Sequence, residues 1–215
     1  EMLRKAITIS PHNYEVYIYV SNLLNSDEFD RPLDSIKCLH VAIALCDYLL
    51  AVEYDEFSYR RISANRLVLL GRIEGHTKKP GGDLDVQNRE LQYYKDALAI
   101  DPTAFHAMFY CGFYYGFSTS SSLVTANVTP ERGLAFEKSI SYFSQTLPIL
   151  DDNKKVIFQS IIYNNIAAMK IQLQLDDEAL EWYDLTLKEN KDMGWAIRDK
   201  SFCLRNVSST SQCEI

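Results

Sequence analysis

The chain has 215 residues, enough for one domain or one elongated array with a continuous core. Hydrophobic residues make up 47% and charged residues 24%, proportions that are ordinary for a globular protein. The net charge of −7 argues against a nucleic-acid surface, because such surfaces usually carry a basic excess. The sequence shows no signal peptide and no apolar run that approaches a membrane span. We therefore expect no membrane insertion and a cytoplasmic protein, with the nucleus as the alternative.

The histidines and cysteines give no sign of a metal or cofactor site. The four histidines, at positions 12, 40, 76 and 106, are scattered and lack the spacing of metal ligands. The five cysteines are an odd number without short paired spacing, so we expect buried free thiols rather than disulfides at Cys38, Cys46 and Cys111. We predict neither a metal nor a cofactor.

Hydrophobic spacing and prolines define the first predicted helices. Met2–Ile9 is ended by Ser10 and Pro11, because proline ends one helix and pre-sets the turn into the next. Tyr14–Leu24 follows, and a long helix begins at Pro32, a residue type favoured in the first turn. The core stripe of that helix consists of Ile36, Leu39, Ala42, Ile43, Cys46, Leu49 and Leu50.

The middle of the chain alternates helices with polar loops. The pattern predicts a helix over Phe57–Glu74, a loop over His76–Asp85 and a helix over Arg89–Ile100. Thr103 is then predicted to cap a helix that runs to Phe117.

The last third begins with a Ser/Thr-rich insertion over Ser118–Thr129. A helix is predicted over Pro130–Leu150, a turn over Asp151–Lys155 and a final helix over Asp192–Val207. Residues Ser208–Ile215 are predicted to form a flexible tail.

Between the turn and the final helix, Ser160–Asn190 has the pattern of two helices packed as a hairpin. Apolar residues recur at three- and four-residue steps in both halves. They are Ile162, Ile166, Met169, Leu173 and Leu175 in the first half, and Ala179, Leu180, Tyr183 and Leu187 in the second. Asp176 and Asp177 lie at the join, where we expect an acidic N-cap and first turn.

Parts of this hairpin recur upstream. The motif Tyr-x-x-aliphatic-small of residues 163–167 returns at residues 17–21 and 59–63. The end of a second helix, with an apolar run and a proline five residues after an alanine, occurs twice: Leu3, Ala6, Ile7, Ile9 and Pro11, and Tyr94, Ala97, Leu98, Ile100 and Pro102. A fourth, less regular pair spans Met108–Tyr115 and Ser139–Leu147.

This pattern resembles the tetratricopeptide repeat (TPR) family. The matching positions are Tyr163, Ile166, Ala167, Ala179, Tyr183 and Leu187, whereas Lys170, Thr186 and Lys191 depart from the family pattern. The resemblance implies an all-α fold, a right-handed superhelical solenoid of antiparallel helix pairs with about four to five repeats of roughly 34 residues and several insertions. We predict one such domain over residues 1–207, with 208–215 as its tail, and expect the chain to be a fragment of a longer protein because it opens within a second helix.

The resemblance also implies a function. We predict a non-catalytic adaptor or scaffold that binds a partner peptide or helix in its concave groove, or that packs as a subunit of a multiprotein complex. One alternative is a regulatory or targeting TPR module of a larger enzyme or of a chaperone-associated protein. A second alternative, an enzyme in its own right, predicts a deep pocket that gathers groups such as His76 or His106.

Three groups of residues are candidates for partner binding. Arg60, Arg61 and Arg66 form a basic patch suited to an acidic partner, unless they pair with Glu53, Asp55 and Glu56. Asn22, Asn164 and Asn165 are polar residues on first helices. Asn165 matches one asparagine of the carboxylate clamp of chaperone-binding TPR domains, but Ile18 replaces the clamp's first lysine and Arg198 has no lysine at the needed step, so we do not expect a clamp.

The third group is Tyr110 and Tyr114, on a helix with aromatic residues all round. Such a helix is either packed on both sides or forms a groove floor that holds apolar anchors, and core packing is the preferred interpretation. Trp182 and Trp195 could instead pack against a neighbour or partner. We predict a protein or peptide partner of acidic character and no direct contact with nucleic acid, and leave the oligomeric state open.

Overall fold

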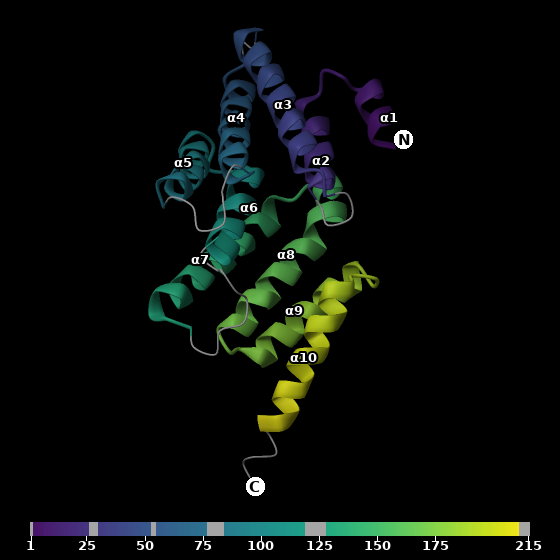
Figure 1. Cartoon of the computed structure of the whole chain (residues 1–215), viewed down its shortest axis with the longest axis vertical. Coiled ribbons are helices and arrows are strands. Elements are labelled where there is room, and N and C mark those ends of the chain that lie inside the picture. The colour runs from purple at the N-terminus through teal and green to yellow at the C-terminus, as the bar shows by residue number, and fades with distance from the viewer. Residues whose placement is uncertain (1, 26–29, 53–54, 77–83, 119–127, 211–215) are drawn as a thin grey trace. The chain divides into compact units, whose positions relative to one another are not determined.

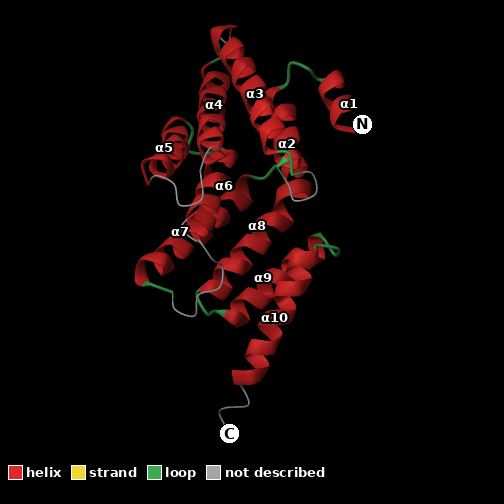
Figure 2. Ribbon diagram, viewed as in Figure 1, coloured by secondary structure: helices red, strands yellow, loops and turns green. Residues whose placement is uncertain are grey.

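The computed structural model describes residues 2–25, 30–52, 55–76, 84–118 and 128–210. All the regular structure in these ranges is helical, which confirms the predicted all-α class (Figures 1 and 2). Most helices pack mainly against their neighbours in sequence, and the closest pairs are α2 with α3, α4 with α5 and α8 with α9. This stacking of helix hairpins is the TPR-like arrangement that the sequence predicted. Contacts divide the chain into two compact units, residues 1–107 and 108–215, and we describe each by itself.

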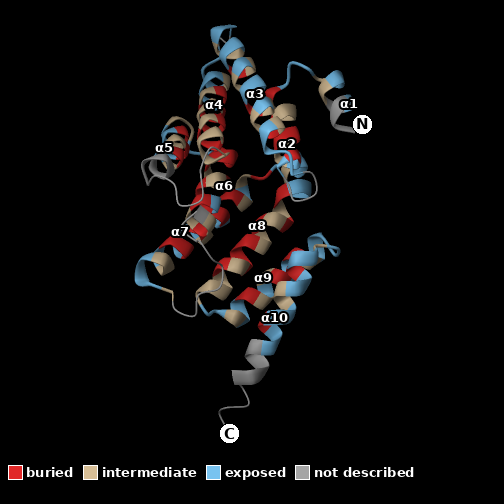
Figure 3. Ribbon diagram, in the orientation of Figure 1, coloured by how far each residue is buried: buried red, intermediate tan, exposed pale blue. Residues whose placement is uncertain are grey.

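Unit 1 contains five helices among its described residues, and α6 begins at its end. Their bounds are α1 Met2–Ile9, α2 Tyr14–Leu24, α3 Pro32–Val52, α4 Glu56–His76, α5 Leu84–Ile100 and α6 Phe105–Phe113. The core lies between α2, α3 and α4, where buried residues gather on the helix sides that face one another (Figure 3). It consists of Tyr14, Ile18, Leu39, Ala42, Cys46, Ile62 and Leu69.

Two polar contacts fix α2 against α4. The Asn65 side-chain amide donates to the Tyr14 hydroxyl at 2.9 Å. The Arg72 guanidinium donates to the Ser21 hydroxyl at 3.0 Å, and Ser21 also bonds to Ser35 of α3 at 2.7 Å. Tyr14 and Ser21 lie seven residues, or two turns, apart on α2, and Asn65 and Arg72 have the same spacing on α4. The two helices therefore run parallel, with matching turns side by side.

Helix α3 is long and apolar enough to cross a membrane by length and composition alone, with a mean hydropathy of 1.7 over its most apolar stretch. This finding corrects the expectation that no apolar run of the sequence approaches a membrane span. Core helices pass the same test, but only 22% of this stretch is buried, including Leu39, Ala42 and Cys46.

Close approach of α4 and α5 depends on Gly71. A Cβ at this position would lie 2.6 Å from the Cε1 atom of Tyr94, whose side chain is only 1% exposed. A glycine therefore allows the Tyr94 ring to pack directly on the α4 backbone.

Unit 2 begins within α6. Its other elements are a π-helical turn Tyr114–Ser118, α7 Pro130–Thr146, a 3₁₀ turn Leu147–Ile149, α8 Asp152–Gln172, α9 Asp176–Glu189 and α10 Gly194–Thr210. Its core includes Ala167, Ala179, Tyr183, Ala196 and Cys203, so small residues let α8, α9 and α10 approach closely.

Aromatic rings join α6 to α7 and α8. The Phe109 ring packs edge-to-face on Phe143 and Phe158, at centroid distances of 5.7 and 5.2 Å. The Ser139 hydroxyl donates to the Gly112 carbonyl at 2.7 Å, next to the π-helical turn. Core packing, the preferred interpretation of the aromatic helix, therefore holds for Phe109.

Several helix ends differ from the sequence prediction. Helix α5 begins at Leu84 rather than Arg89, and α8 begins at Asp152, because the Asp151 carboxylate caps it by accepting from the Lys154 amide at 2.8 Å. Thr103 does not cap α6: its hydroxyl donates to Asp101 at 2.7 Å. Helix α10 continues to Thr210 rather than Val207.

The turn between α8 and α9 also differs. Leu175 occupies the position before α9 and makes no side-chain cap, so Asp176 and Asp177 form the first turn only. Gln174 has a positive φ of 60°. The Gln174 amide donates to Ile171 at 2.9 Å and the Leu175 amide to Lys170 at 3.0 Å, the hydrogen-bond pattern of a Schellman motif.

Other predictions fall partly outside the described residues. Most of the loop His76–Asp85, most of the insertion Ser118–Thr129 and the end of the tail, residues 211–215, are not described. The described cysteines Cys38, Cys46, Cys111 and Cys203 are free thiols; Cys46 and Cys111 are buried as predicted, whereas Cys38 is only half-buried. The prediction of a single repeat domain over residues 1–207 stays a prediction.

Candidate partner-binding surfaces

The three arginines of the predicted basic patch lie on α4 with different surroundings. Arg60 donates from Nε and Nη2 to the Ile100 carbonyl, at 3.0 and 2.7 Å, and so caps the C-terminal end of α5. Arg66 pairs with Asp47 of α3. Arg61 is exposed, with its guanidinium 5.9 Å from the centroid of the Phe57 ring.

Two of these arginines therefore hold neighbouring elements of unit 1 together. Ion pairing, the alternative considered for this patch, applies to Arg66, although its acid is Asp47 and not Asp55 or Glu56. Glu53 lies outside the described residues. Arg61 is exposed, and its charge is a minor cause, after hydrogen bonding, of the lowered pKa of Asp55, so it remains a candidate contact for an acidic partner.

A hollow of about 520 Å³ lies beside Arg60 in unit 1. Its lining consists of Asp55, Glu56, Phe57, Arg60, Asp101 and Pro102. The Asp55 carboxylate accepts from the Ser58 amide at 2.7 Å, and this hydrogen bond holds the pKa of Asp55 below its usual range. Asp101 accepts from the Thr103 amide and hydroxyl. Both carboxylates thus accept hydrogen bonds that stabilise a helix start or a turn.

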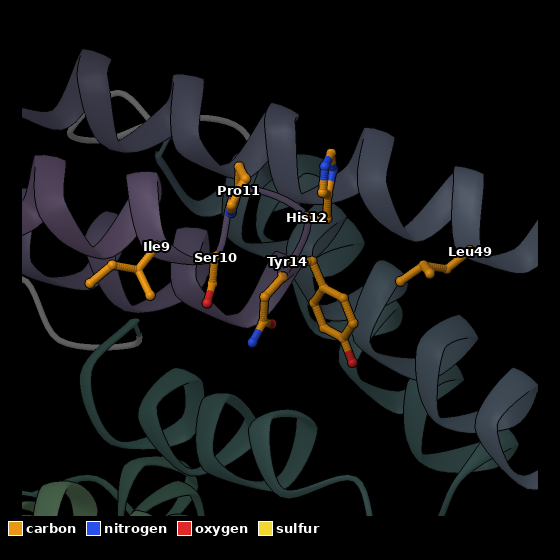
Figure 4. Close-up of a pocket in the computed structure, with 7 residues that line it drawn as sticks. Ile9, Ser10, Pro11, His12, Tyr14 and Leu49 are labelled. Carbon is orange, nitrogen blue, oxygen red and sulfur yellow. The ribbon is translucent and has the colours of Figure 1, made fainter.

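A second hollow, of about 490 Å³, lies where the α1–α2 turn faces α3 (Figure 4). Its lining consists of Ile9, Ser10, Pro11, His12, Asn13, Tyr14 and Leu49. Ile9, Pro11 and His12 are exposed, whereas Tyr14 is buried and its hydroxyl already bonds to Asn65. The hollow is open, and His12 is the titratable side chain of its lining that is exposed to solvent.

The predicted asparagines are divided between the units. Asn22 is half-buried on α2 of unit 1, and Asn164 and Asn165 lie on α8 of unit 2. Asn165 is only 6% exposed. The Oδ1 atom of Asn164 and the Nδ2 atom of Asn165 are buried, and neither has a hydrogen-bond partner within the described part of the chain. Burial removes Asn165 from direct reach of a partner, while Asn164 keeps partial access.

The predicted tyrosines lie in the aromatic cluster of unit 2. Tyr110 is half-buried, with its ring 5.5 Å edge-on from Phe109. Tyr114 is 8% exposed and begins the π-helical turn, with its ring 5.8 Å from that of Tyr115. Tyr110 is therefore the more accessible of the two.

The histidines considered for catalysis do not line either hollow. His106 is buried, and burial followed by the charge of Arg72 lowers the pKa of His76 to about 4. His76 is therefore neutral at neutral pH. Among the residues that the structure describes, no group of three or more His, Cys, Asp or Glu side chains is placed to hold a metal ion.

Helix α10 presents a face that the sequence analysis did not assemble. Trp195 is 57% exposed and Phe202 51% exposed, and Arg198 and Arg205 are exposed beside them. Steps of three, four and three residues place these four side chains on one side of the helix, which we call the α10 face. Ala196 and Cys203, on another side, are buried in the core of unit 2.

The α10 face alternates aromatic rings with cations. The Arg198 guanidinium donates to Asp199 at 2.7 Å, and this bond raises the pKa of Arg198 above its already high value. The spacing of Trp195, Arg198, Phe202 and Arg205 was visible in the sequence. The sequence interpretation considered Trp195 and Arg198 separately, because neither Phe202 nor Arg205 belongs to a repeat motif.

No family model matches the chain, and no curated protein matches it. Similar solved structures include two crystal structures of MamA, each 17% identical to this chain with a TM-score of 0.44. Both matches cover 88% of this chain; they cover 85% of one MamA chain and 79% of the other. Another is YrrB, described as a TPR protein with an unusual peptide-binding site, at 16% identity and a TM-score of 0.42 over 94% of this chain and 98% of that one.

These comparisons concern the fold. The helix pairs described above make the chain an all-α protein of TPR-like helical-repeat architecture. Stacked helical repeats of this kind create extended concave surfaces.

Proposed function

We propose that the chain is a non-catalytic interaction module that binds a partner protein or peptide, as an adaptor or as a subunit of a larger assembly. One observation carries this proposal: large apolar side chains remain exposed on a helix whose other side is packed in the core. Trp195 and Phe202, which share one side of α10, are each more than half exposed. Grouped apolar side chains on a surface favour a protein interface.

The helices support such an interface physically. In unit 2, the inner side of α10 is fixed by Ala196 and Cys203 against α8 and α9. The backbone of a fixed helix loses little additional freedom when a partner binds, so less of the contact free energy is offset by ordering. We place this interaction in the cytoplasm, with the nucleus as the alternative, and expect no role for a metal or cofactor.

The test is affinity capture from cell lysate, followed by reconstitution of each complex from purified components. We compare wild type with Trp195→Ser/Phe202→Ser and with Arg61→Glu, after circular dichroism confirms that all three are folded. Arg60 is left unchanged because its substitution would disturb the end of α5. We expect at least one partner to form a stoichiometric complex with the purified wild-type chain. Failure of every captured protein to reconstitute would contradict the proposal.

A further inference from the structure

We propose that the α10 face binds a short acidic segment of a partner protein. Aspartate or glutamate side chains would contact Arg198 and Arg205, and apolar side chains would pack on Trp195 and Phe202. This inference rests on the proposed interaction function and names the chemistry of the partner. It adds the α10 face to Arg61 of α4 as a candidate contact for an acidic partner, whereas Arg60 and Arg66 hold Ile100 and Asp47.

The spacing of the α10 face limits the length of the segment. Trp195 and Arg205 are ten residues apart, which corresponds to about 15 Å along a helix. A segment of about ten residues matches this span as a helix, and one of about five matches it when extended. In either form the segment must alternate acidic and apolar side chains, as the α10 face alternates arginines and aromatic rings.

The residue types suit tight recognition of carboxylates. Tryptophan and arginine are enriched among the residues that contribute most to protein interfaces. A guanidinium can donate two parallel hydrogen bonds to one carboxylate, which fixes its orientation. The Arg198 side chain is 73% exposed, so a partner carboxylate can reach it despite its bond to Asp199.

The surrounding charges favour a short acidic segment over an extended polyanion. Helix α9 packs against α10 and exposes Glu181 and Asp184, and Asp184 pairs with Lys200 of α10. Glu178 and Glu189 of α9 are also exposed. A nucleic acid or an anionic membrane would meet these carboxylates and the overall charge of −7, whereas a segment confined to the α10 face avoids α9.

The experiment is selection of random peptides displayed on phage against the whole chain. The pool is first depleted on the folded variant Trp195→Ser/Phe202→Ser. We expect the selected peptides to be rich in Asp and Glu alternating with apolar residues. Their affinity should fall at least about tenfold for Arg198→Glu/Arg205→Glu, since each arginine loses a charge-assisted contact and gains a repulsive one. The matched control is Lys95→Glu/Lys188→Glu, two exposed lysines outside the α10 face, and we expect a change of less than about twofold.

Four results would overturn the inference, three from binding measurements with peptides and model ligands and one from a reconstituted partner. The first is that no selected peptide distinguishes wild type from the depleted variant, and the second is that the selected peptides are neutral or basic. The third is that Trp195 and Phe202 instead govern self-association of the chain, or binding to single-stranded DNA or phosphatidylserine vesicles, each measured directly. If a reconstituted partner binds the arginine variant as tightly as wild type, this inference fails and the interaction function stands. If no partner reconstitutes, the interaction function itself fails.

Discussion

The Asn65–Tyr14 hydrogen bond links two buried side chains from helices that are not consecutive. Each residue is 7% exposed, so removal of one partner leaves the other without water to replace it. We expect Tyr14→Phe to lower the free energy of unfolding by about 1–3 kcal/mol, because the Asn65 amide stays buried. Urea denaturation followed by circular dichroism measures this.

A double-mutant cycle provides the control. Tyr14→Phe combined with Asn65→Leu should cost less than the sum of the two single changes, with a coupling of about 1 kcal/mol. Gln92→Ala removes an exposed bond to Asp96 and should change stability by less than about 0.5 kcal/mol. Additive single changes would show that the hydrogen bond contributes nothing to unit 1.

Burial could be predicted residue by residue, but partners could not. The hydrophobic steps correctly placed Leu39, Ala42 and Cys46 inside. A charged residue gives no comparable signal, because its partner can lie anywhere in the chain: Arg60 bonds to a carbonyl forty residues away. The candidate site was therefore the part of the prediction that sequence alone left least defined.

The turn between α8 and α9 gives a prediction at the scale of elements. Gln174 adopts a positive φ, which costs a residue with a Cβ about 1–2 kcal/mol and costs glycine little. We expect Gln174→Gly to raise the free energy of unfolding by about 0.5–1 kcal/mol, the gain being reduced by the greater freedom of glycine in the unfolded chain. Thermal and urea unfolding measure the change.

A glycine elsewhere in the hairpin should have the opposite effect. Glu181 is exposed in the middle of α9, so Glu181→Gly should lower stability by about 1 kcal/mol. If both substitutions destabilise the protein equally, Gln174 does not hold the left-handed conformation in solution.

Helix existence was predicted more accurately than helix ends. Tyr14–Leu24 matches α2 at both ends, because Pro11, Asn13 and the polar stretch after Leu24 mark its limits. The π-helical turn at Tyr114–Ser118 was not predicted, since its residues are as apolar as those of α6 and the change of register leaves no periodic signal. Thr103 was misassigned because a hydroxyl before a helix can cap it or bond backwards, as it does here to Asp101.

At the scale of the whole molecule, the excess of acidic residues governs solubility. The 29 Asp and Glu outnumber the 22 Lys and Arg, and the sequence pI is about 5.1. We expect turbidity to be greatest near pH 5, where net charge vanishes and exposed apolar groups such as the α10 face can associate. Light scattering across pH 4–8 checks this, and a maximum far from pH 5 would contradict it.

The helical-repeat class could be predicted for the whole chain because the same motif recurs, so each copy supports the others. The division into units 1–107 and 108–215 could not, because the boundary falls within α6, in a stretch that is apolar on both sides of it. Contacts between helices, rather than any change in composition, define it.

The placement of the two tryptophans gives the protein a built-in optical reporter. Both lie in unit 2: Trp182 is half-buried, with its ring 5.5 Å from Tyr163, and Trp195 is mostly exposed on the α10 face. Tryptophan fluorescence will therefore report on unit 2 and not on unit 1. An occupant of the α10 face will shift the Trp195 emission to shorter wavelength, so an unlabelled partner can be titrated directly.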